Sequence, residues 1–503
     1  MRVNVLIVGG GIMGAAVAAE VRAARPDVGI TVVDTGPVIG DTPGLHLHDV
    51  EDEGIWGAYN QLAGGGNQAV YVGAQLERTL GGEPSAARPG IYDLAAFDGV
   101  APTLPGAAIA WNAGGMGVHW TAATPVPYGA EVPYAVDPGE WRADLVRAQE
   151  LLATNPDPYG PSPAREPVLG TLTELFGAVS DPGRGPQPMP MAINEGPDGR
   201  LYRTGPSRIF PPIGGDNEPR TNVVTETTCL RVLSEDGRAS GAVVRSLRTG
   251  EERVIEADVV VVAADALRTP QLLWASGIRP EALGHYMNEH AMLTGRTELD
   301  HERLGVDLAT LPPLRDREWN SGSSWLPVSG ERQPFQAQLM EGTMEDEDGT
   351  TTGYVVGLTW YVPTEIRREN RIEFGDELDP VGMPAMRVHF SRSPADEEAI
   401  TAARADQARV GHALGRFDPE RDTAILPAGS SLHMTGTVRM GSVDDGTSVC
   451  DPNGLVWGTE NVFVAGNGVL PTALAANSTL AGTVTAVRAA RAVAALVPEG
   501  VQA

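Results

Sequence analysis

The feature that most restricts the fold of this sequence is a glycine-rich turn close to its start. Gly9, Gly11 and Gly14 form a G-x-G-x-x-G pattern between the apolar residues 3–8 and the alanine-rich residues 15–24. In a strand–turn–helix unit, these glycines permit a tight turn, close approach of the backbone to a pyrophosphate, and packing of the helix on the strand. The pyrophosphate then lies at the positive end of the helix. The pattern predicts a Rossmann-type α/β fold that binds a dinucleotide.

A carboxylate stands where such a site needs one. Asp34 ends the second apolar run, residues 29–34, about 20 residues after the glycines. An acidic residue in that place accepts hydrogen bonds from ribose hydroxyls. We expect the flanking residues to contact the dinucleotide as well, namely Ile12, Met13 and Thr35. The turn and the carboxylate do not by themselves distinguish FAD from NAD.

The charge of the chain narrows the classes of partner. The formal net charge is −28, and all 37 basic side chains are arginine because the sequence contains no lysine. A surface this acidic repels nucleic acid and anionic lipid and favours neutral or cationic small molecules. Schiff-base chemistry on a lysine amine is excluded. We therefore expect a small-molecule substrate and neither a nucleic-acid nor a membrane partner.

The number of cysteines and the N-terminal residues indicate where in the cell the protein is expected. The two cysteines, Cys229 and Cys450, are too few for a disulfide framework or a cysteine-rich metal site, so we expect no metal. Met1 leads directly into the apolar residues 3–8, without the pattern of a signal peptide. No apolar run reaches the length of a membrane span. These features predict a cytoplasmic, soluble protein.

The apolar pattern changes along the chain. Continuous or alternating apolar residues predict strands and two helices, the strands at 222–233, 239–248, 254–264 and 461–465 and the helices at 270–276 and 479–496. Residues 291–395 alternate in several places, including 335–340 and 353–361, and an amphipathic helix follows at 396–415. The chain is therefore predicted to be an α/β protein, with a Rossmann-type domain and an α+β domain built on an antiparallel sheet.

Residues 60–106 lack such periodicity. They contain the glycines 64–66, the pair Gly81 and Gly82, and two prolines, Pro84 and Pro89, which disfavour regular structure. A long segment without elements inside a compact protein is usually a functional loop. We expect residues 64–97 to form a mobile lid over the substrate site.

One histidine lies in a stretch rich in glycine and hydroxyl side chains. Residues 433–441 read His-Met-Thr-Gly-Thr-Val-Arg-Met-Gly, and Asn477 follows within residues 475–479. These residues resemble the glucose-methanol-choline (GMC) oxidoreductase family, which has H-x-x-G-T-x-R-M-G and a second histidine or asparagine before its last helix. Residues 260–277 and 283–290 also look like segments of that family. The resemblance is weakest in residues 155–220 and 300–420.

The branch of the family can be narrowed. Residues 114–121, Gly-Gly-Met-Gly-Val-His-Trp-Thr, are similar to a pyranose oxidase segment that passes the flavin ring. In fungal members the residue that matches His119 is bonded covalently to the flavin, but Val118 departs from the hydroxyl residue of their motif. Covalent attachment at His119 therefore stays open. Asparagine at Asn477 also follows the pyranose oxidase pattern, and the length is similar to that of the bacterial pyranose and glycoside oxidases.

The resemblance implies FAD as the cofactor and a division into domains. Besides the glycine turn, Asp34 and their neighbours, the residues implied in FAD binding are Met116, Gly117, Val118, His119, Trp120, Thr121, Cys229, Asn467, Asn477, Ser478 and Thr479. The FAD-binding domain is expected to comprise residues 1–165, 221–290 and 429–503. Residues 166–220 are expected to cross between the domains, and residues 291–428 to form the substrate-binding domain. We expect a monomer or a dimer.

The chemistry of alcohol oxidation agrees with the resemblance. Hydride leaves an alcohol carbon only if the hydroxyl proton also leaves, and a neutral imidazole is a natural acceptor for that proton. His433 is the expected base, and the amide of Asn477 is expected to orient the substrate oxygen. Gln336 and Gln338 share one face of a predicted strand and are candidates for binding sugar hydroxyls. His290 is interpreted as structural.

The sequence thus predicts an FAD-dependent oxidase of a secondary alcohol of a sugar. The expected position is C2 or C3 of a pyranose, with C3 of a glycoside or C-glycoside favoured. Hydride goes to flavin N5, and the electrons go to O2, giving H2O2, or to another acceptor. The alternatives are another GMC alcohol oxidase or dehydrogenase, for a polyol, choline or a sterol, and a non-catalytic flavin-binding protein. A choline enzyme requires a carboxylate cage with aromatic faces, and simple binding requires neither His433 nor Asn477.

Overall fold

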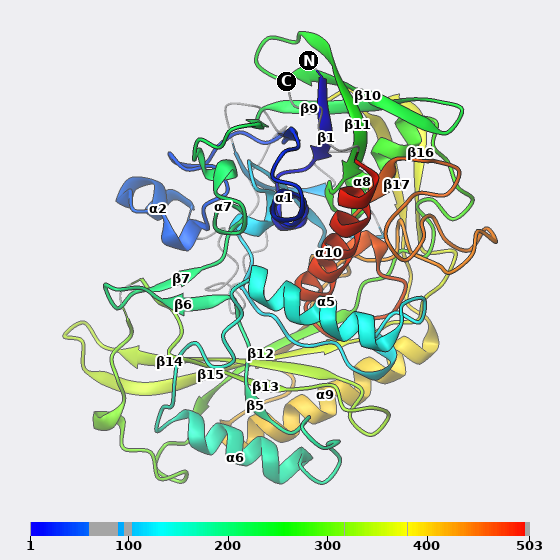
Figure 1. Cartoon of the computed structure of the whole chain (residues 1–503). Helices are drawn as coiled ribbons and strands as arrows, with labels where there is room; N and C mark the ends of the chain where they lie inside the picture. Colours follow the sequence, from blue (N-terminus) through cyan, green and yellow to red (C-terminus); the bar gives the residue numbers. More distant parts are fainter. Residues whose placement is uncertain (1, 60–88, 95–102, 316, 380, 498–503) are drawn as a thin grey trace.

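A computed structural model of the protein describes residues 2–59, 89–94, 103–315, 317–379 and 381–497. Its two main sheets lie in the upper and the lower half of Figure 1. The first sheet has seven strands in the order β8-β2-β1-β11-β10-β9, with β20 also paired to β11. These strands are β1 (Arg2–Val8), β2 (Ile30–Val33), β8 (Thr221–Val224), β9 (Thr227–Glu235), β10 (Arg238–Ser246), β11 (Glu252–Val262) and β20 (Val462–Val464). Five of them run parallel, whereas β10 is antiparallel to both of its neighbours.

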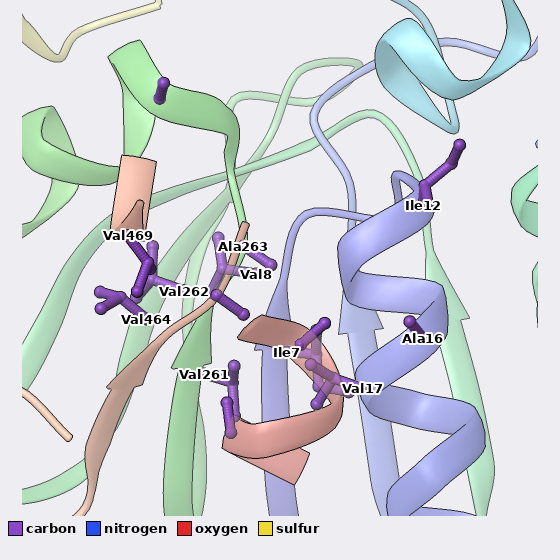
Figure 2. Packing of buried hydrophobic residues seen from close by; sticks show 14 of the residues in the cluster. Ile7, Val8, Ile12, Ala16, Val17, Val261, Val262, Ala263, Val464 and Val469 are labelled. Atoms are coloured by element: carbon purple, nitrogen blue, oxygen red, sulfur yellow. The ribbon is translucent and has the colours of Figure 1, made fainter. Parts of the chain in front are cut away.

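The centre of the first sheet is buried on both faces, as a parallel sheet covered by helices requires. Figure 2 shows Ile7 of β1 and Val261 of β11 beside Val17 of the first helix, with Val262 facing Val464 of β20. The continuous runs of valine, isoleucine and alanine in β1 and β11 are therefore core residues. They hold the carboxyl ends of these strands in place, which is where ligands bind in open α/β sheets.

Helices flank the first sheet. In Figure 1, α1 (Ile12–Ala24) lies beside the closing helix α10 (Thr479–Leu496), which in turn packs against α5 (Pro138–Leu151). The alanines of α1 allow close packing, since Ala15, Ala16 and Ala18 are all fully buried. The helix α8 (Asp265–Ala275) follows β11 directly and contacts β9.

The second sheet is antiparallel and has the order β18-β12-β15-β14-β13-β5, with β19 also paired to β12. Its strands are β5 (Gln187–Pro188), β12 (Ala291–Leu299), β13 (Gly322–Leu326), β14 (Gln336–Glu345), β15 (Thr351–Val362), β18 (Gly415–Arg416) and β19 (Thr423–Ile425). The helices α6 (Arg165–Phe176) and α9 (Pro394–Leu414) pack on it and close a separate apolar core. The α/β class with an added antiparallel sheet, predicted from sequence, is confirmed.

Shorter elements connect these layers. Two-stranded sheets are formed by β3 (Gly90–Asp93) with β4 (Ala108–Trp111), β6 (Ile193–Glu195) with β7 (Leu201–Arg203), and β16 (Arg371–Leu378) with β17 (Pro384–His389). The remaining helices and helical turns are α2 (Glu53–Tyr59), α7 (Pro206–Ile209), η1 (Leu47–Asp49), η4 (Gly115–Val118), η5 (Gly129–Glu131), η6 (Pro211–Gly214), η7 (Leu308–Thr310) and η8 (Asn467–Val469). No helix in the described ranges combines the length and the apolarity needed to cross a bilayer.

Two local predictions differ from the structure, and a third, the lid, lies largely outside the described residues. The strand expected at 222–233 is two strands, because Glu226 has a φ of +50° and ends β8, which pairs with β2, before β9 turns to pair with β10. The helix expected at 270–276 begins at Asp265 and keeps Pro270 in its interior. The predicted lid at 64–97 lies largely outside the described residues, although residues 90–93 form β3.

Candidate active site

A cavity of about 340 Å³ opens at the carboxyl ends of β1, β2 and β11 and extends to His433. This volume is typical of small-molecule and cofactor sites, ~300–1,000 Å³. Its walls bring together most of the predicted site residues: Gly9, Gly11, Ile12, Met13, Asp34, Thr35, Met116, Gly117, His119, Trp120, Thr121, Cys229, His433, Asn467, Asn477 and Thr479. The walls do not include Gly14, Val118, Gln336, Gln338 or Ser478.

The three glycines of the turn are required to different degrees by the packing of the protein. A Cβ on Gly9 would lie 2.3 Å from the carbonyl oxygen of Ala263, and Gly9 also has a φ of +104°. A Cβ on Gly14 would lie 1.9 Å from the carbonyl oxygen of Gly9, so Gly14 allows the helix to pack and does not form part of the cavity wall. At Gly11, the nearest protein atom would be 3.6 Å away, an ordinary contact. Protein packing therefore does not require Gly11, whereas a ligand approaching the backbone would.

Asp34 joins the turn to a second segment of the wall. Its carboxylate accepts hydrogen bonds from the backbone N–H groups of Gly10 (3.0 Å), Gly36 (2.8 Å) and Gly114 (3.2 Å). Burial raises the pKa of Asp34, and the three N–H groups oppose that shift. This carboxylate thus fixes the glycine turn against residues 114–117 at the place where a ribose would lie.

Three further features fit a dinucleotide such as FAD. The helices α1 and α10 both begin at the cavity, and neither has a side-chain cap nor an acidic residue in its first turn. Their N-terminal ends therefore present positive potential to an anionic group. The Oδ1 atom of Asn467 is buried on the wall without a partner among the described residues, while its Nδ2 donates to Ser478 (2.8 Å). Ser478 thus orients Asn467 and does not line the cavity itself.

The segment 114–121, which contains the helical turn η4, passes along the cavity. The His119 ring lies with Nε2 2.7 Å from Oδ1 of Asn112, whose Nδ2 donates to the carbonyl oxygen of Gly115 (3.1 Å). Val118 points away and packs in a small apolar cluster with Leu47 and Ile91. Asn112 was missed in the sequence, where its only signal is its place just before the glycines.

His433 lies beside a second histidine. Its Nδ1 is 2.9 Å from Nε2 of His290, whose Nδ1 is 2.9 Å from the carbonyl oxygen of Leu474. The two rings are nearly perpendicular, at 84°. Tyr361, which was also missed, contacts both rings and lines the cavity. Tyr361 was expected only as part of a strand, and nothing in the sequence indicated that it contacts the two histidines.

Burial decides the protonation of the two histidines. It lowers the pKa of His290 to about 4, and it lowers the pKa of His433 well below its usual value. Both rings are therefore neutral at neutral pH. A carbonyl oxygen only accepts hydrogen bonds, so the single proton of His290 lies on Nδ1 and its Nε2 accepts from His433. The proton of His433 is then on Nδ1, and its Nε2 is an unprotonated base on the cavity wall.

The backbone that carries His433 is fixed by a buried carboxylate. Glu289 accepts from the N–H groups of Gly429 and Ser431 and from the Ser431 hydroxyl (2.6 Å). The Ser431 oxygen in turn accepts from the N–H of His433 (3.1 Å). Leu432, between them, has a φ of +58°. Adjacent residues Glu289 and His290 therefore position the loop and the ring of the same histidine.

Asn477 has a defined orientation as well. Its Oδ1 accepts from Nε2 of Gln336 (3.1 Å), and Oε1 of Gln336 accepts from Nε1 of Trp325 (3.1 Å). This leaves the Nδ2 donor of Asn477 directed to another partner. Gln336 thus acts on the site through Asn477, whereas Gln338 contacts the sulfur of Met340. Neither glutamine lines the cavity.

A dinucleotide cavity that ends at an imidazole base and an amide donor defines an oxidoreductase that acts on an alcohol. The comparisons with known proteins agree. Family models described as GMC oxidoreductase match residues 216–292 and 367–486. The chain belongs to the GMC oxidoreductase family, in the branch of pyranose and C-glycoside oxidases, and its cofactor is FAD. The resemblance noted in the sequence is confirmed.

Relatives cover nearly the whole chain. It is 38% identical to the C-glycoside 3-oxidases of Microbacterium trichothecenolyticum, over 98% of this chain and 96% of that protein, and of Arthrobacter globiformis, over 98% and 95%. It is 31% identical to the pyranose 2-oxidase of Tricholoma matsutake over 78% of this chain and 74% of the other.

Two solved structures share the fold. The pyridoxine 4-oxidase from Mesorbium loti superposes with a TM-score of 0.62 at 16% identity, covering 97% of this chain and 99% of the other. The formate oxidase of Aspergillus oryzae superposes with a TM-score of 0.64 at 14% identity, covering 98% of both. At these identities the likeness concerns the fold alone.

Proposed function

We propose that this protein oxidises a secondary alcohol of a sugar, with C3 of a glycoside or C-glycoside as the favoured position. The observation that carries the proposal is the unprotonated Nε2 of His433 on the cavity wall, defined by the chain from Leu474 through His290. The relatives named C-glycoside 3-oxidase support the substrate class. The net charge of −28 suits an uncharged sugar.

His433 takes the hydroxyl proton of the substrate at Nε2. The Nδ1–H of the resulting imidazolium continues to donate to His290, which supports the positive charge. Asn477 donates from Nδ2 to the substrate oxygen and keeps the hydroxyl directed at the base, because its Oδ1 is engaged by Gln336. FAD, when bound, would supply the hydride acceptor at N5 and the route for electrons to O2 or another acceptor.

We further propose that FAD is held without a covalent bond to His119. The Nε2 of His119 is engaged by Asn112, which is itself anchored to Gly115, so this hydrogen bond would have to break before that nitrogen could bond carbon. The wall residues around the glycine turn and the uncapped starts of α1 and α10 would hold the cofactor by hydrogen bonds and charge. Denaturation in acid tests this proposal: flavin released into the supernatant supports it, and flavin that precipitates with the chain contradicts it.

The substrate proposal is tested by anaerobic reduction of the bound flavin. Free pyranoses, O-glycosides and C-glycosides are mixed with the holoenzyme, bleaching near 450 nm is followed, and NMR of the product identifies the oxidised carbon. We expect the fastest bleaching with a glycoside and a 3-keto product. A free pyranose oxidised at C2 is the second candidate, favoured by the pyranose 2-oxidase relatives. Bleaching by choline or a sterol alone would contradict both.

Four further interpretations accompany the proposal. We propose the domain division given above, a lid at residues 64–97, a cytoplasmic location supported by the two cysteines, and a monomer or dimer. Slow hydrogen exchange across 64–97 in the free enzyme would argue against a mobile lid. A tetramer mass in light scattering would argue against the proposed assembly.

A further inference from the structure

The hairpin of β16 and β17 forms a two-stranded sheet of its own and lies against α8 beside the first sheet (Figure 1). Its turn supplies two apolar side chains to the FAD cavity. Val381 and Met383 are 8% and 5% exposed, and both line the cavity wall. Neither the glycine turn nor the catalytic motif accounts for them.

The residues that contact this turn show that it lies at the Asp34 end of the cavity. The N–H of Thr227 donates to the carbonyl oxygen of Asp34, so the start of β9 lies directly beside the ribose carboxylate. Thr228 pairs with Arg245 across β9 and β10, and the Arg245 guanidinium donates to the carbonyl oxygen of Val381. The contacts lead step by step from Asp34 to the hairpin turn.

The same end of the wall contains Thr228 and Cys229 of β9 and Arg268, Gln271 and Leu272 of α8. A nucleotide base is attached to its ribose, so the base lies next to the group that Asp34 binds. We propose that the hairpin turn, comprising Asp379 and residues 381–383, covers the adenine ring of FAD. Met383 presents a polarisable thioether and Val381 a compact apolar group, and both can pack against an aromatic ring. The inference rests on FAD binding and is independent of the sugar substrate.

The turn is fastened by a buried carboxylate. Oδ1 of Asp379 accepts from the N–H groups of Val381 (3.0 Å) and Met383 (2.8 Å). Its Oδ2 accepts from Gln271 (3.2 Å) and Arg268 (3.3 Å) of α8. The Asp379 side chain has no exposed surface. One carboxylate therefore shapes the turn and ties it to the helix that borders the cavity.

Additional contacts hold the turn in register. Nε2 of Gln271 also donates to the carbonyl oxygen of Pro384 (2.7 Å). Gly382 has a φ of +80°, and a Cβ there would lie 2.6 Å from a guanidinium nitrogen of Arg245. The two apolar side chains are thus presented by a turn with little freedom, which favours a binding surface over a loose loop.

Met383→Ala is the first test, measured as equilibrium binding to the apoprotein. FAD affinity is expected to fall about tenfold, as is the affinity for ADP, which carries the adenine half alone. FMN, which lacks adenine, is expected to bind as it does to the unchanged protein. Met386→Ala is the matched control, because Met386 is buried at 1% exposure in β17 and does not line the cavity. It should lower the melting temperature without changing the preference for FAD over FMN.

Asp379→Asn provides a second variant with little change in size. The substitution removes the negative charge and one of the two carboxylate oxygens, the acceptor for Gln271 and Arg268. The turn should then be held less firmly over the adenine ring, so FAD should dissociate several times faster while the fold is kept. Equal FAD affinity in Met383→Ala and the unchanged protein would overturn the proposal, as would a parallel loss of FMN affinity. Failure of the unchanged protein to bind FAD would instead count against the cofactor itself, whereas failure to oxidise sugars leaves this inference unaffected.

Discussion

At the scale of single residues, the site depends on which nitrogen of His433 carries the proton. His433→Ala removes the base and leaves the glycine turn and the helix ends intact. We expect full FAD content and a loss of flavin reduction of ~10²–10⁴-fold, the usual range for general-base catalysis. Asn477→Ala should lose less, since it removes one hydrogen bond to the substrate oxygen. Rapid-mixing absorbance with a glycoside measures both rates, and near-normal reduction in His433→Ala would remove it from the mechanism.

His290 is the positioning residue for that base. Glutamine can still accept from Nδ1–H of His433 and donate to Leu474, whereas leucine can do neither. We expect flavin reduction within about tenfold of the unchanged enzyme for His290→Gln and a further ~10-fold loss or more for His290→Leu. A residue needed only for packing would not separate the two variants.

The pH profile gives an independent readout of the same pair. Because burial lowers the pKa of His433, the base stays unprotonated, and reduction should stay fast, at pH values somewhat below 6.5. In His290→Leu the free choice of tautomer should lower the rate across the whole pH range. A sharp loss of rate on descending through pH 6.5 in the unchanged enzyme would contradict the lowered pKa.

At the scale of elements, α8 shows how the catalytic motif also supports a helix. Pro270 has no N–H to donate to the carbonyl oxygen of Ala266, four residues earlier. The hydroxyl of Thr437, the threonine of the H-x-x-G-T motif, donates to that oxygen instead. The motif therefore contributes a base at its first position and a helix contact at its fifth.

Thr437→Val tests this contact with almost no change in shape. It leaves the buried oxygen of Ala266 without its partner, which should cost about 1–3 kcal/mol of the free energy of unfolding. Chemical denaturation of the holoenzyme measures the difference. Thr401→Val is the control, because the hydroxyl of Thr401 donates to Glu397 within the exposed face of α9 and should matter little. Equal effects of both substitutions would refute the role of Thr437.

At the scale of the whole molecule, the second sheet carries a titratable group that links stability to pH. Burial raises the pKa of Glu341 from 4.5 to about 7, although Ser324 and Tyr354 donate to it. The folded state thus binds a proton that the unfolded chain releases near pH 4.5. Its stabilising contribution is complete below pH 4.5 and is lost as the pH rises through 7.

Glu341→Gln should abolish this dependence, because the amide has no proton to lose. We expect the variant to be more stable than the unchanged protein above pH 7, by about 1–3 kcal/mol, and to show little advantage at pH 5. Thermal melts across this range, with the flavin bound in both proteins, give the comparison. An advantage that is the same at pH 5 and pH 8 would show that the carboxyl does not titrate there.

Much of the fold and part of the site followed from local patterns. Gly9 and Gly14 mark the turn because any Cβ there would collide with backbone, and continuous valine and alanine mark β11 because both of its faces are buried. Helix and strand periodicities are local properties of the chain, so they can be read without knowing the neighbours. The same holds for the spacing of His433 within its motif.

The amino-acid sequence by itself determined the dinucleotide turn, the α/β class with an added antiparallel sheet, and the candidate base of this protein. Only the tertiary structure decided what acts on that base. His290 reaches His433 across 143 positions, and Gln336 reaches Asn477 across 141. The hairpin turn reaches the nucleotide end of the cavity through Arg245, 136 positions before Val381. Such contacts arise only when separate parts of the fold pack together. Hydrogen bonds between residues far apart in the sequence produce no periodic pattern from which they could be predicted.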